Sequence, residues 1–373
     1  MILGYDATTL VGRISGVGYY TQRLLQSLSA GAGGKDIDRV LVLSNRDVAV
    51  AENERVRIPK GPQFPIRSVW MQLHLPLLLR RLRPDLVHYT NYLAPVVGDA
   101  PYVVSFHDMT LLLFPHLHTA KKRLLTASLI PRVARRASLI LAPSEASRRD
   151  VIRLLGVDPA RVRMIPYAAP DDFRPAAAGP EALAEYGVAP PYLLYVGTLE
   201  PRKNLPRTLR AFARVAASHP DARLVLVGQR GWDYEDVLRE AQTPALRDRV
   251  LMLGYVREEH LPLLYTHATA FVYPSLYEGF GFPVVEAMAC GTPVLTSRSS
   301  SLSEIAEGAA LVVDPEDEAA LAEGMDGLLG DAALRADLRT RGLARVACYS
   351  WERTARETVV AYREVQENLR RHL

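Results

Sequence analysis

The chain has 373 residues, 49% of them apolar, a length that favours two domains and a composition sufficient for two hydrophobic cores. Its two cysteines, Cys290 and Cys348, have no paired spacing, which argues against a disulfide framework or a zinc site and fits a reducing compartment. Residues 1–174 carry 24 Lys and Arg against 14 Asp and Glu, a net +10, and the remainder carries 21 against 27, a net −6. The first half is therefore expected to meet an anionic surface or substrate.

The N-terminal sequence has no basic region followed by a long apolar run, so we do not expect a signal peptide. No segment reaches the roughly 18 uncharged apolar residues that span a bilayer. Lysines and arginines interrupt the longest candidate, Met109 to Leu141. We expect a cytoplasmic protein, either soluble or peripheral on the inner face of the membrane.

Short β-rich runs alternate with helical stretches through residues 1–175, which predicts an N-terminal Rossmann-like domain with a parallel sheet. Gly16 and Gly18 precede its first helix. They supply only two glycines of a dinucleotide fingerprint, which indicates a close-approach turn rather than NAD binding. Strands are expected at residues 2–7, 39–43, 85–89, 102–106, 138–142 and 162–165, and helices around 19–28, 68–82, 120–136 and 145–155.

Two histidines stand near the carboxyl ends of predicted strands in this half. His107 and Asp108 end one apolar strand, and His88 and Asn91 hold a comparable place on the strand before it. A histidine at such a position could donate a hydrogen bond to a sugar hydroxyl or steady a reaction centre. The alternative is a purely structural role, which is common for an isolated histidine.

The Pro- and Ala-rich segment Pro170–Pro191 is interpreted as an interdomain linker. Residues 190–350 then repeat the strand–helix alternation and predict a second Rossmann-like domain, while residues 351–373 predict a charged helix that could cross back to the first domain. The fold class is therefore α/β, with two doubly wound parallel sheets facing a central cleft, because ligands of such sheets bind at the carboxyl ends of the strands. Strands are expected at residues 192–196, 223–227, 250–253, 270–273, 293–296 and 310–313.

A basic loop follows the first strand of the second half. It carries Arg202 and Lys203, with Asn204 as a credible N-cap and Pro206 early in the next helix. The forked guanidinium of an arginine and the point charge of a lysine suit a diphosphate. The alternative is an ordinary exposed basic loop.

A second turn places two carboxylates, Glu278 and Glu286, eight positions apart at the start of a helix. Gly281 gives the turn backbone freedom, Pro283 suits the first helical position, and Gly291 suits the position just past the helix end. Unpaired N–H groups at a helix start bind phosphate, and carboxylates accept hydrogen bonds from sugar hydroxyls. The pattern favours a binding site for a sugar nucleotide. The alternative is that one Glu is a solvent-exposed loop residue and that the helix dipole favours the other.

Three segments in this order carry a resemblance: GTLEPRKN at 197–204, the E-x7-E pattern at 278–286, and SEIAEGAALVVDPED at 303–317. Together they resemble the retaining glycosyltransferases of family 4 (glycosyl transferases group 1), which have the GT-B fold, over essentially the full chain. The resemblance implies that Glu286 binds the nucleotide ribose and that Arg202 and Lys203 hold the diphosphate. It also implies that Glu278 contacts the donor sugar.

The resemblance assigns further residues. Backbone amides near Phe280 and Gly281 would assist Glu278, Gly16 would let the first domain approach the diphosphate, and His107 would lie near the transferred sugar. Thr198 stands where many members carry a basic residue or a serine, which leaves open how many charges meet the diphosphate. The base pocket is expected at residues 254–257, around Val256.

The resemblance implies hexose transfer with retention of configuration and without a required metal or other cofactor. The negative charge that develops on the leaving phosphate could be stabilised by Arg202, Lys203 and the helix start after Gly281. The sequence LLLFP after the His-Asp pair resembles members that build bacterial surface polysaccharides, many of them mannosyltransferases. This favours GDP-mannose, with UDP- or dTDP-sugars as alternatives, and a glycan or lipid-linked acceptor. Two other functions stay open: a nucleotide-sugar epimerase on the same architecture, or a non-catalytic nucleotide-sugar-binding module.

The basic segment Lys121 to Arg153, with the apolar run Leu111–Phe114 upstream, suggests contact with an anionic membrane surface where a lipid-linked acceptor would lie. An ordinary solvated helix face with arginines over core residues is an equal alternative. We expect no nucleic-acid partner.

Overall fold

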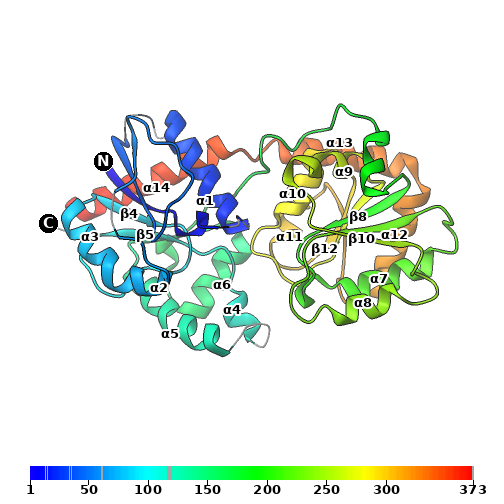
Figure 1. Cartoon of the computed structure of the whole chain (residues 1–373), viewed down its shortest axis with the longest axis horizontal. Coiled ribbons are helices and arrows are strands. Elements are labelled where there is room, and N and C mark those ends of the chain that lie inside the picture. Colours follow the sequence, from blue (N-terminus) through cyan, green and yellow to red (C-terminus); the bar gives the residue numbers. More distant parts are fainter. Residues whose placement is uncertain are drawn as a thin grey trace. The chain divides into compact units, whose positions relative to one another are not determined.

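The computed structural model describes residues 1–12, 14, 16–32, 34, 36–59, 62–115 and 120–371, with the side chains of all of these except 32 and 120–127. The chain forms two compact units (Figure 1). Unit 1 comprises Met1–Tyr167 and Ser350–Leu373, and unit 2 comprises Ala168–Tyr349. Each unit is built on one parallel β-sheet flanked by helices.

The sheet of unit 1 has the strand order β3-β2-β1-β4-β5-β6-β7. The order reverses between β1 and β4, so the loops after these two strands meet at a topological switch point. The six strands predicted for this half are confirmed, and the two-residue strand β3 was missed because it is too short to show an alternating pattern. The strands are β1 Ile2–Asp6, β2 Arg39–Leu43, β3 Val56–Arg57, β4 Leu86–Tyr89, β5 Tyr102–Ser105, β6 Leu139–Ala142 and β7 Val162–Met164.

Helices surround this sheet, and their ends follow local sequence rules. The Ser144 side chain caps α6 by accepting the Ser147 N–H, and Gly156 ends the same helix in the left-handed conformation. The last helix, α14, packs on α1 in unit 1. The helices are α1 Gly16–Ser27, α2 Arg67–Val69, α3 Leu75–Leu82, α4 Thr110–Leu113, α5 Ala120–Arg136, α6 Glu145–Leu155 and α14 Trp351–Arg371, and π-helical turns cover Leu28–Ala32 and Trp70–His74.

The sheet of unit 2 has the order β10-β9-β8-β11-β12-β13. Its switch point lies between β8 and β11, which pair in parallel. All six predicted strands are present: β8 Tyr192–Val196, β9 Arg223–Val227, β10 Val250–Gly254, β11 Ala270–Tyr273, β12 Val294–Ser297 and β13 Leu311–Val313. The helices are α7 Leu205–Val215, α8 Glu235–Ala241, α9 Leu261–His267, α10 Phe282–Ala289, α11 Ser300–Ile305, α12 Glu318–Gly330 and α13 Ala332–Val346.

The segment interpreted as a linker, residues 170–191, packs against unit 2. The ring of Phe173 is buried with its centroid 6.0 Å from that of Tyr265. The Ala176 N–H donates to Thr266 Oγ1 at 2.9 Å. The segment therefore contacts α9 and lies at the start of unit 2.

Candidate functional site

Two loops of unit 2 meet at the switch point, one after β8 and one after β11. Because β8 and β11 are paired neighbours, both loops leave the sheet at its carboxyl edge. The backbone carbonyl of Arg202 in the first loop accepts the Leu276 N–H of the second at 2.8 Å. The two loops therefore form one surface with a fixed register.

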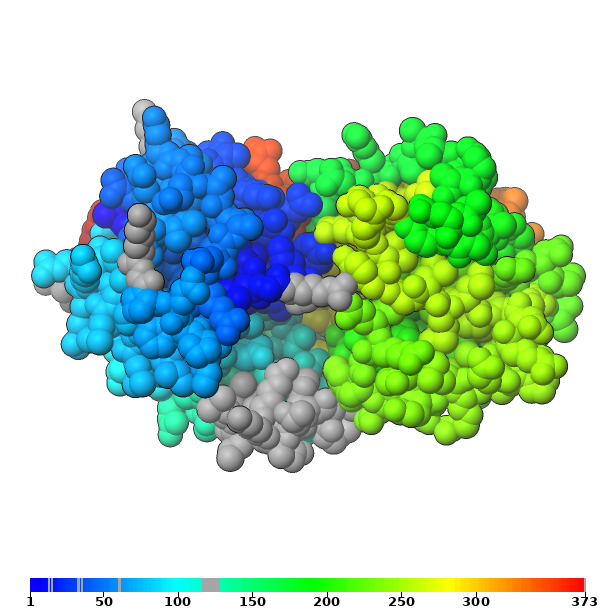
Figure 2. All heavy atoms as spheres, viewed as in Figure 1, coloured from blue at the N-terminus to red at the C-terminus, as the bar shows by residue number. Residues whose placement is uncertain are grey.

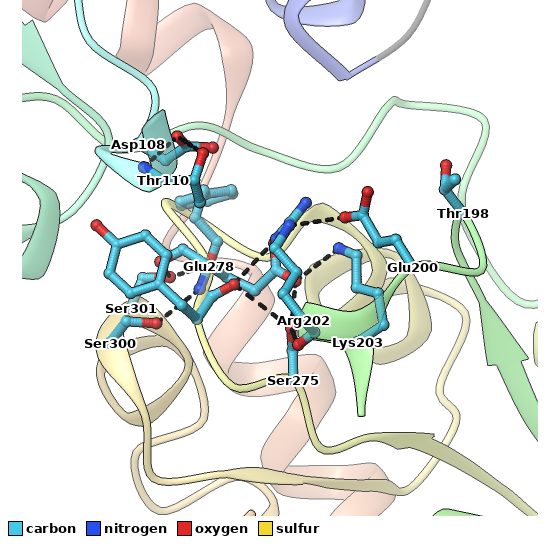
Figure 3. A network of polar contacts seen from close by, with 12 residues as sticks. Asp108, Thr110, Thr198, Glu200, Arg202, Lys203, Ser275, Glu278, Ser300 and Ser301 are labelled. Atoms are coloured by element: carbon cyan, nitrogen blue, oxygen red, sulfur yellow. Dashed lines mark hydrogen bonds and ion pairs between the residues drawn. The ribbon is translucent and has the colours of Figure 1, made fainter. Parts of the chain in front are cut away.

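The Glu278 carboxylate is the centre of a buried polar network (Figure 3). Its Oε1 accepts from Lys203 Nζ at 2.6 Å, from Ser275 Oγ at 2.6 Å and from the Tyr273 hydroxyl at 3.0 Å. Its Oε2 pairs with Arg202 Nη1 at 2.8 Å. The structure thus brings together three predicted site residues, Glu278, Arg202 and Lys203.

This network keeps Glu278 ionised. Burial alone would raise the pKa of Glu278, but Arg202, Lys203 and the hydrogen bonds from Lys203 and Ser275 together lower it to about 2. Burial is also the main cause that lowers the pKa of Lys203, and Glu278 opposes that effect. A carboxylate with so low a pKa accepts hydrogen bonds but does not donate a proton as a general acid.

Arg202 connects this network to a second acid. Its Nε lies 2.7 Å from Glu200 Oε1 while its Nη1 reaches Glu278. Two cations therefore face two carboxylates in this cluster, and the charges balance. Thr198 is exposed at the rim of the same loop. Glu200 was missed by the sequence analysis, which had no reason to separate it from any other loop acid.

Asn204 has a different role from the one predicted. It occupies the N-cap position of α7 with φ +62°, but its side chain makes no capping hydrogen bond. Its Nδ2 instead donates to the carbonyl oxygens of Pro274 at 3.2 Å and Pro315 at 2.6 Å. The left-handed backbone, which asparagine tolerates, lets the side chain join the basic loop to the chain after β11 and to the chain after β13.

The turn before α10 confirms the expectation for Gly281. Its φ is +110°, and a Cβ there would stand 2.7 Å from Leu302 Cδ2, so a larger residue would be strained on both counts. Pro283 is the second residue of α10, one place after the predicted first position. Gly291, just past the helix, has φ +73°, as a glycine past a helix end commonly does.

Two serines of α11 hold this turn in place, and the sequence analysis missed both. Ser300 Oγ accepts the Glu278 N–H at 2.8 Å. Ser301 Oγ lies 2.9 Å from the Glu278 carbonyl and 2.7 Å from the Phe280 carbonyl. The serine-rich run after β12 was the available signal, but only the fold shows that it lies against the Glu278 turn (Figure 3).

Glu286 lies on α10, half-buried, and its Oε2 accepts from the Tyr265 hydroxyl at 3.0 Å. Burial raises the pKa of Glu286 to about 7, and the Tyr265 hydrogen bond opposes that rise only in part. The two glutamates therefore differ in charge state near neutral pH. Glu278 is held ionised by cations, whereas Glu286 titrates.

The loop after β10 was predicted to hold the base. There the structure buries Val256 and exposes Tyr255, with Gly254 in the left-handed region at φ +66°. The Gly254 carbonyl accepts the Gly228 N–H at 2.7 Å. The ring of Tyr255 is therefore more accessible to a base at this loop than the Val256 side chain is.

The predicted residues of unit 1 form a separate set. His107 Nε2 donates to the Thr90 carbonyl at 2.7 Å, and its Nδ1 lies 2.8 Å from the Tyr167 hydroxyl. Burial lowers the pKa of His107, opposed by Thr90 and Asp108. A neutral ring fits both bonds, so both nitrogens of His107 are already engaged. Gly16 begins α1, and a Cβ at this position would meet nothing within 4 Å.

His88 is buried deeper in unit 1. The Tyr362 hydroxyl of α14 bonds to its Nδ1 at 2.6 Å, and its Nε2 lies 2.9 Å from Ser105 Oγ. Burial, and then the neighbouring His107, lower the pKa of His88 to about 3. These contacts support the structural alternative for His88.

Neither a metal site nor a membrane-spanning helix is found in the part of the chain that the structure describes. No group of three or more His, Cys, Asp or Glu side chains is placed to hold a metal ion there. No helix in the same residues is long and apolar enough to cross a membrane. Lys121, Lys122 and Arg123, which open the predicted membrane-contact segment, lie outside the residues with described side chains.

Comparison with known proteins decides the family. Residues 185–345 match the family profile for glycosyl transferases group 1, and residues 14–173 match the profile for glycosyltransferase family 4. The O-antigen chain mannosyltransferase B of Escherichia coli is 32% identical over 368 residues, which covers 94% of this chain and 96% of that protein. The chain belongs to the family 4 glycosyltransferases. It is therefore a glycosyltransferase enzyme, and the resemblance drawn from its motifs is confirmed.

Solved structures define the fold of this glycosyltransferase. Sucrose-phosphate synthase from Thermosynechococcus elongatus superposes with a TM-score of 0.75 at 24% identity and covers 98% of each chain. Anabaena HepE in complex with UDP-glucose gives a TM-score of 0.75 at 19% identity, covering 98% of this chain and 99% of that one. The predicted GT-B fold, with two Rossmann-like units, is confirmed.

Proposed function

We propose that this glycosyltransferase transfers a hexose from a nucleotide sugar, with retention of anomeric configuration and without a metal ion. Mannose from GDP-mannose is the favoured donor, and the acceptor is a glycan or a lipid-linked glycan of cell-surface polysaccharide or glycolipid synthesis. The similarity to an O-antigen chain mannosyltransferase supports the sugar and the acceptor class. The fold shared with a protein solved with UDP-glucose supports a nucleotide-sugar donor.

The observation that carries the proposal is the pairing of Glu278 with Arg202 and Lys203 at the carboxyl edge of the unit 2 sheet. Arg202 and Lys203 suit the diphosphate, since a guanidinium fork and an ammonium group both bind phosphate oxygens. Oε1 of Glu278 accepts three hydrogen bonds, whereas Oε2 pairs with Arg202. Because Oε2 has one partner where Oε1 has three, Oε2 is the oxygen that we propose accepts a hydroxyl of the donor sugar.

The charge states support a direct transfer. As the sugar leaves, negative charge develops on the phosphate, and Arg202 and Lys203 can stabilise it electrostatically. Because its pKa is low, Glu278 stays negatively charged. This charge favours the positive charge that develops on the sugar. We propose front-face transfer, in which the leaving phosphate takes the acceptor's proton. The acceptor oxygen then bonds to the anomeric carbon as the bond to the phosphate breaks, and no protein base is needed.

The remaining assignments are part of the same proposal. Glu286 binds the ribose hydroxyls, and the backbone amides at Phe280 and Gly281 assist Glu278. The loop of Val256 receives the base. We also propose that Gly16 and Thr198 contact the diphosphate, that His107 acts near the transferred sugar, and that the enzyme works at the inner face of the cytoplasmic membrane.

The donor is tested by calorimetric titration with GDP, UDP, dTDP and ADP, followed by transfer assays with the matching sugars. We expect GDP to bind most tightly and mannose to be transferred with an α-linked product from an α-linked donor, read by NMR. Binding of UDP alone would overturn the mannose assignment. Isomerisation of the donor without any acceptor would overturn glycosyl transfer itself.

A further inference from the structure

An apolar stripe runs along the outside of unit 1, over α2, the following π-helical turn and α3. Ile66, Val69, Leu73 and Leu77 are between 41 and 67% exposed. They are spaced three or four residues apart, so they share one side of the helical segment. Val97 is 63% exposed, and the loop before it is tied to this segment because Gln72 bonds to Ala94 and Val96.

The opposite side of the same segment faces the core of unit 1. Trp70, Met71, Leu75 and Leu79 are buried there and belong to the core cluster. The segment therefore has apolar residues on both sides, and only one side is needed for folding. The other large apolar side chains exposed in the described chain are distributed over several elements, Met164, Trp232, Tyr255, Val312, Val360 and Leu369. Scattered exposure is normal, whereas a contiguous apolar patch marks an interaction surface.

Arginines gather at the C-terminal end of the stripe. Arg80, Arg81 and Arg83 are exposed, and the side chains of Arg81 and Arg83 form no hydrogen bond or ion pair with any described residue. Arg80 lies 3.8 Å from the 91% exposed Asp99. A guanidinium group at such a distance from so exposed an acid is weakly held. Positive charge is therefore available beside the apolar side chains.

A pocket of about 250 Å³ lies next to these arginines. Arg80, Arg83 and Arg136 line it together with Tyr89 and Val97. Tyr89 is 2% exposed, and its hydroxyl bonds to no other described residue. Asp99 also lines the pocket, and Arg136 already donates to the Val96 and Gly98 carbonyls. Arg80 and Arg83 are therefore the arginines of this pocket that place positive charge at the edge of the apolar surface.

We propose that this α2–α3 face, made of Ile66, Val69, Leu73, Leu77 and Val97 with Arg80, Arg81 and Arg83, docks on an anionic lipid bilayer. Exposed apolar side chains beside cations are the features that bind a helix to an anionic lipid interface. A neutral protein partner would not require the arginines, and a soluble anion would not require the stripe. The cyan-blue part of unit 1 that holds this face is at the surface in Figure 2.

This inference deepens the proposed function, because it gives a membrane position to an enzyme with a lipid-linked acceptor. It places the contact on residues 66–97 rather than on Lys121–Arg153. The docking itself does not depend on sugar transfer, so the two can fail separately.

The test is co-sedimentation of the full chain with vesicles of phosphatidylglycerol and phosphatidylcholine, and with phosphatidylcholine alone, at low salt. We expect binding to the anionic vesicles only. Leu73→Ser/Leu77→Ser should weaken it about tenfold or more, since each leucine loses apolar burial. Arg80→Gln/Arg81→Gln/Arg83→Gln should weaken it about 100-fold at low salt.

Matched controls come from exposed residues outside the face. Val312→Ser/Val360→Ser removes two exposed apolar side chains outside the face, and Arg239→Gln/Arg247→Gln/Arg341→Gln removes the same charge from unit 2. Both control variants should bind vesicles like the wild type. All variants should keep their melting temperature and their affinity for the nucleotide sugar, which separates lost docking from lost folding or donor binding.

Three results would overturn the proposal. The first is no binding of the wild type to anionic vesicles. The second is loss of binding only in Lys121→Gln/Lys122→Gln/Arg123→Gln, with the α2–α3 variants unaffected. The third is a dimer by light scattering that Leu73→Ser/Leu77→Ser converts to monomer without changing vesicle binding, which would make the face a contact between two copies of the chain.

Discussion

Both units carry buried polar groups near the carboxyl ends of their strands, but of different kinds. In unit 1, His88 and His107 bond to Tyr362, Ser105, Tyr167 and the Thr90 carbonyl. In unit 2, Glu278 is held by Arg202 and Lys203. One set is neutral and joins elements of its own unit, and the other is charged and buried beneath two loops at the carboxyl edge of its sheet.

The same sheet architecture therefore carries polar groups for two purposes. Burying a neutral, hydrogen-bonded histidine costs little free energy, so His88 can fix α14 to the sheet. A buried ion pair costs desolvation and adds little net stability. The Glu278 cluster is therefore better explained by the charge it presents to a ligand than by the stability it gives to unit 2.

Breaking the charged cluster should give the largest effect. Glu278→Ala leaves Lys203, which is buried, without its carboxylate, and removing one partner of a buried pair costs about 3–5 kcal/mol. We expect a clear drop in the melting temperature of unit 2 and loss of transfer, measured by calorimetry and by product formation.

The double variant Lys203→Met/Glu278→Gln separates these two effects. It removes both charges, so we expect it to recover much of the lost stability but none of the transfer. Recovery of transfer with stability would show that the cluster serves folding alone.

Breaking the neutral network should affect stability without affecting chemistry. Tyr362→Phe leaves the buried Nδ1 of His88 without its hydrogen-bond partner, at a cost of about 1–3 kcal/mol. We expect a lower unfolding midpoint for unit 1 in denaturant, with kcat for transfer unchanged. A fall in kcat at full stability would contradict the division between the two units.

The third prediction sharpens the contrast between the two glutamates. Burial raises the pKa of Glu286 to about 7, so the carboxyl is mostly protonated at pH 6 and mostly ionised at pH 8. An ionised carboxylate accepts hydrogen bonds from ribose hydroxyls more strongly than a protonated carboxyl does. Affinity for the nucleotide sugar should therefore rise with pH by up to about tenfold over this range. Calorimetry on Glu286→Gln should show no such rise; an unchanged pH dependence would remove Glu286 from the ribose site.

The same raised pKa gives Glu286 a signed effect on stability. The folded protein keeps this proton up to about pH 7, whereas the unfolded chain loses it near pH 4.3. Stability therefore falls as pH rises between these values, and the full penalty applies above pH 7. Glu286→Gln should be more stable than the wild type at pH 8 and nearly equal to it at pH 4.

The sequence predicted the sheet strands because apolar runs and their spacing determine them locally, as at Tyr192–Val196 and Ala270–Tyr273. It also predicted Gly281, because a positive φ selects glycine. It did not predict Ser300 or Ser301, because their partners at Glu278 and Phe280 are distant in the chain. It did not predict Glu200, because nothing in the sequence separates this residue from other loop acids. Composition placed a connection between the units at 170–191, but it does not show that Phe173 packs on Tyr265.

We propose above all that Arg202 and Lys203 hold the diphosphate of the donor. This assignment is tested most directly by comparing the affinities of the best nucleoside diphosphate and of its nucleoside, in the wild type and in Arg202→Gln, with Arg214→Gln as a control on α7. Hydrogen bonds to charged groups contribute about 1.5–3 kcal/mol. We predict that Arg202→Gln weakens binding of the nucleoside diphosphate by about tenfold to 100-fold and leaves nucleoside binding unchanged. If the wild type and Arg202→Gln bound the diphosphate more tightly than the nucleoside by the same factor, Arg202 would not hold the diphosphate.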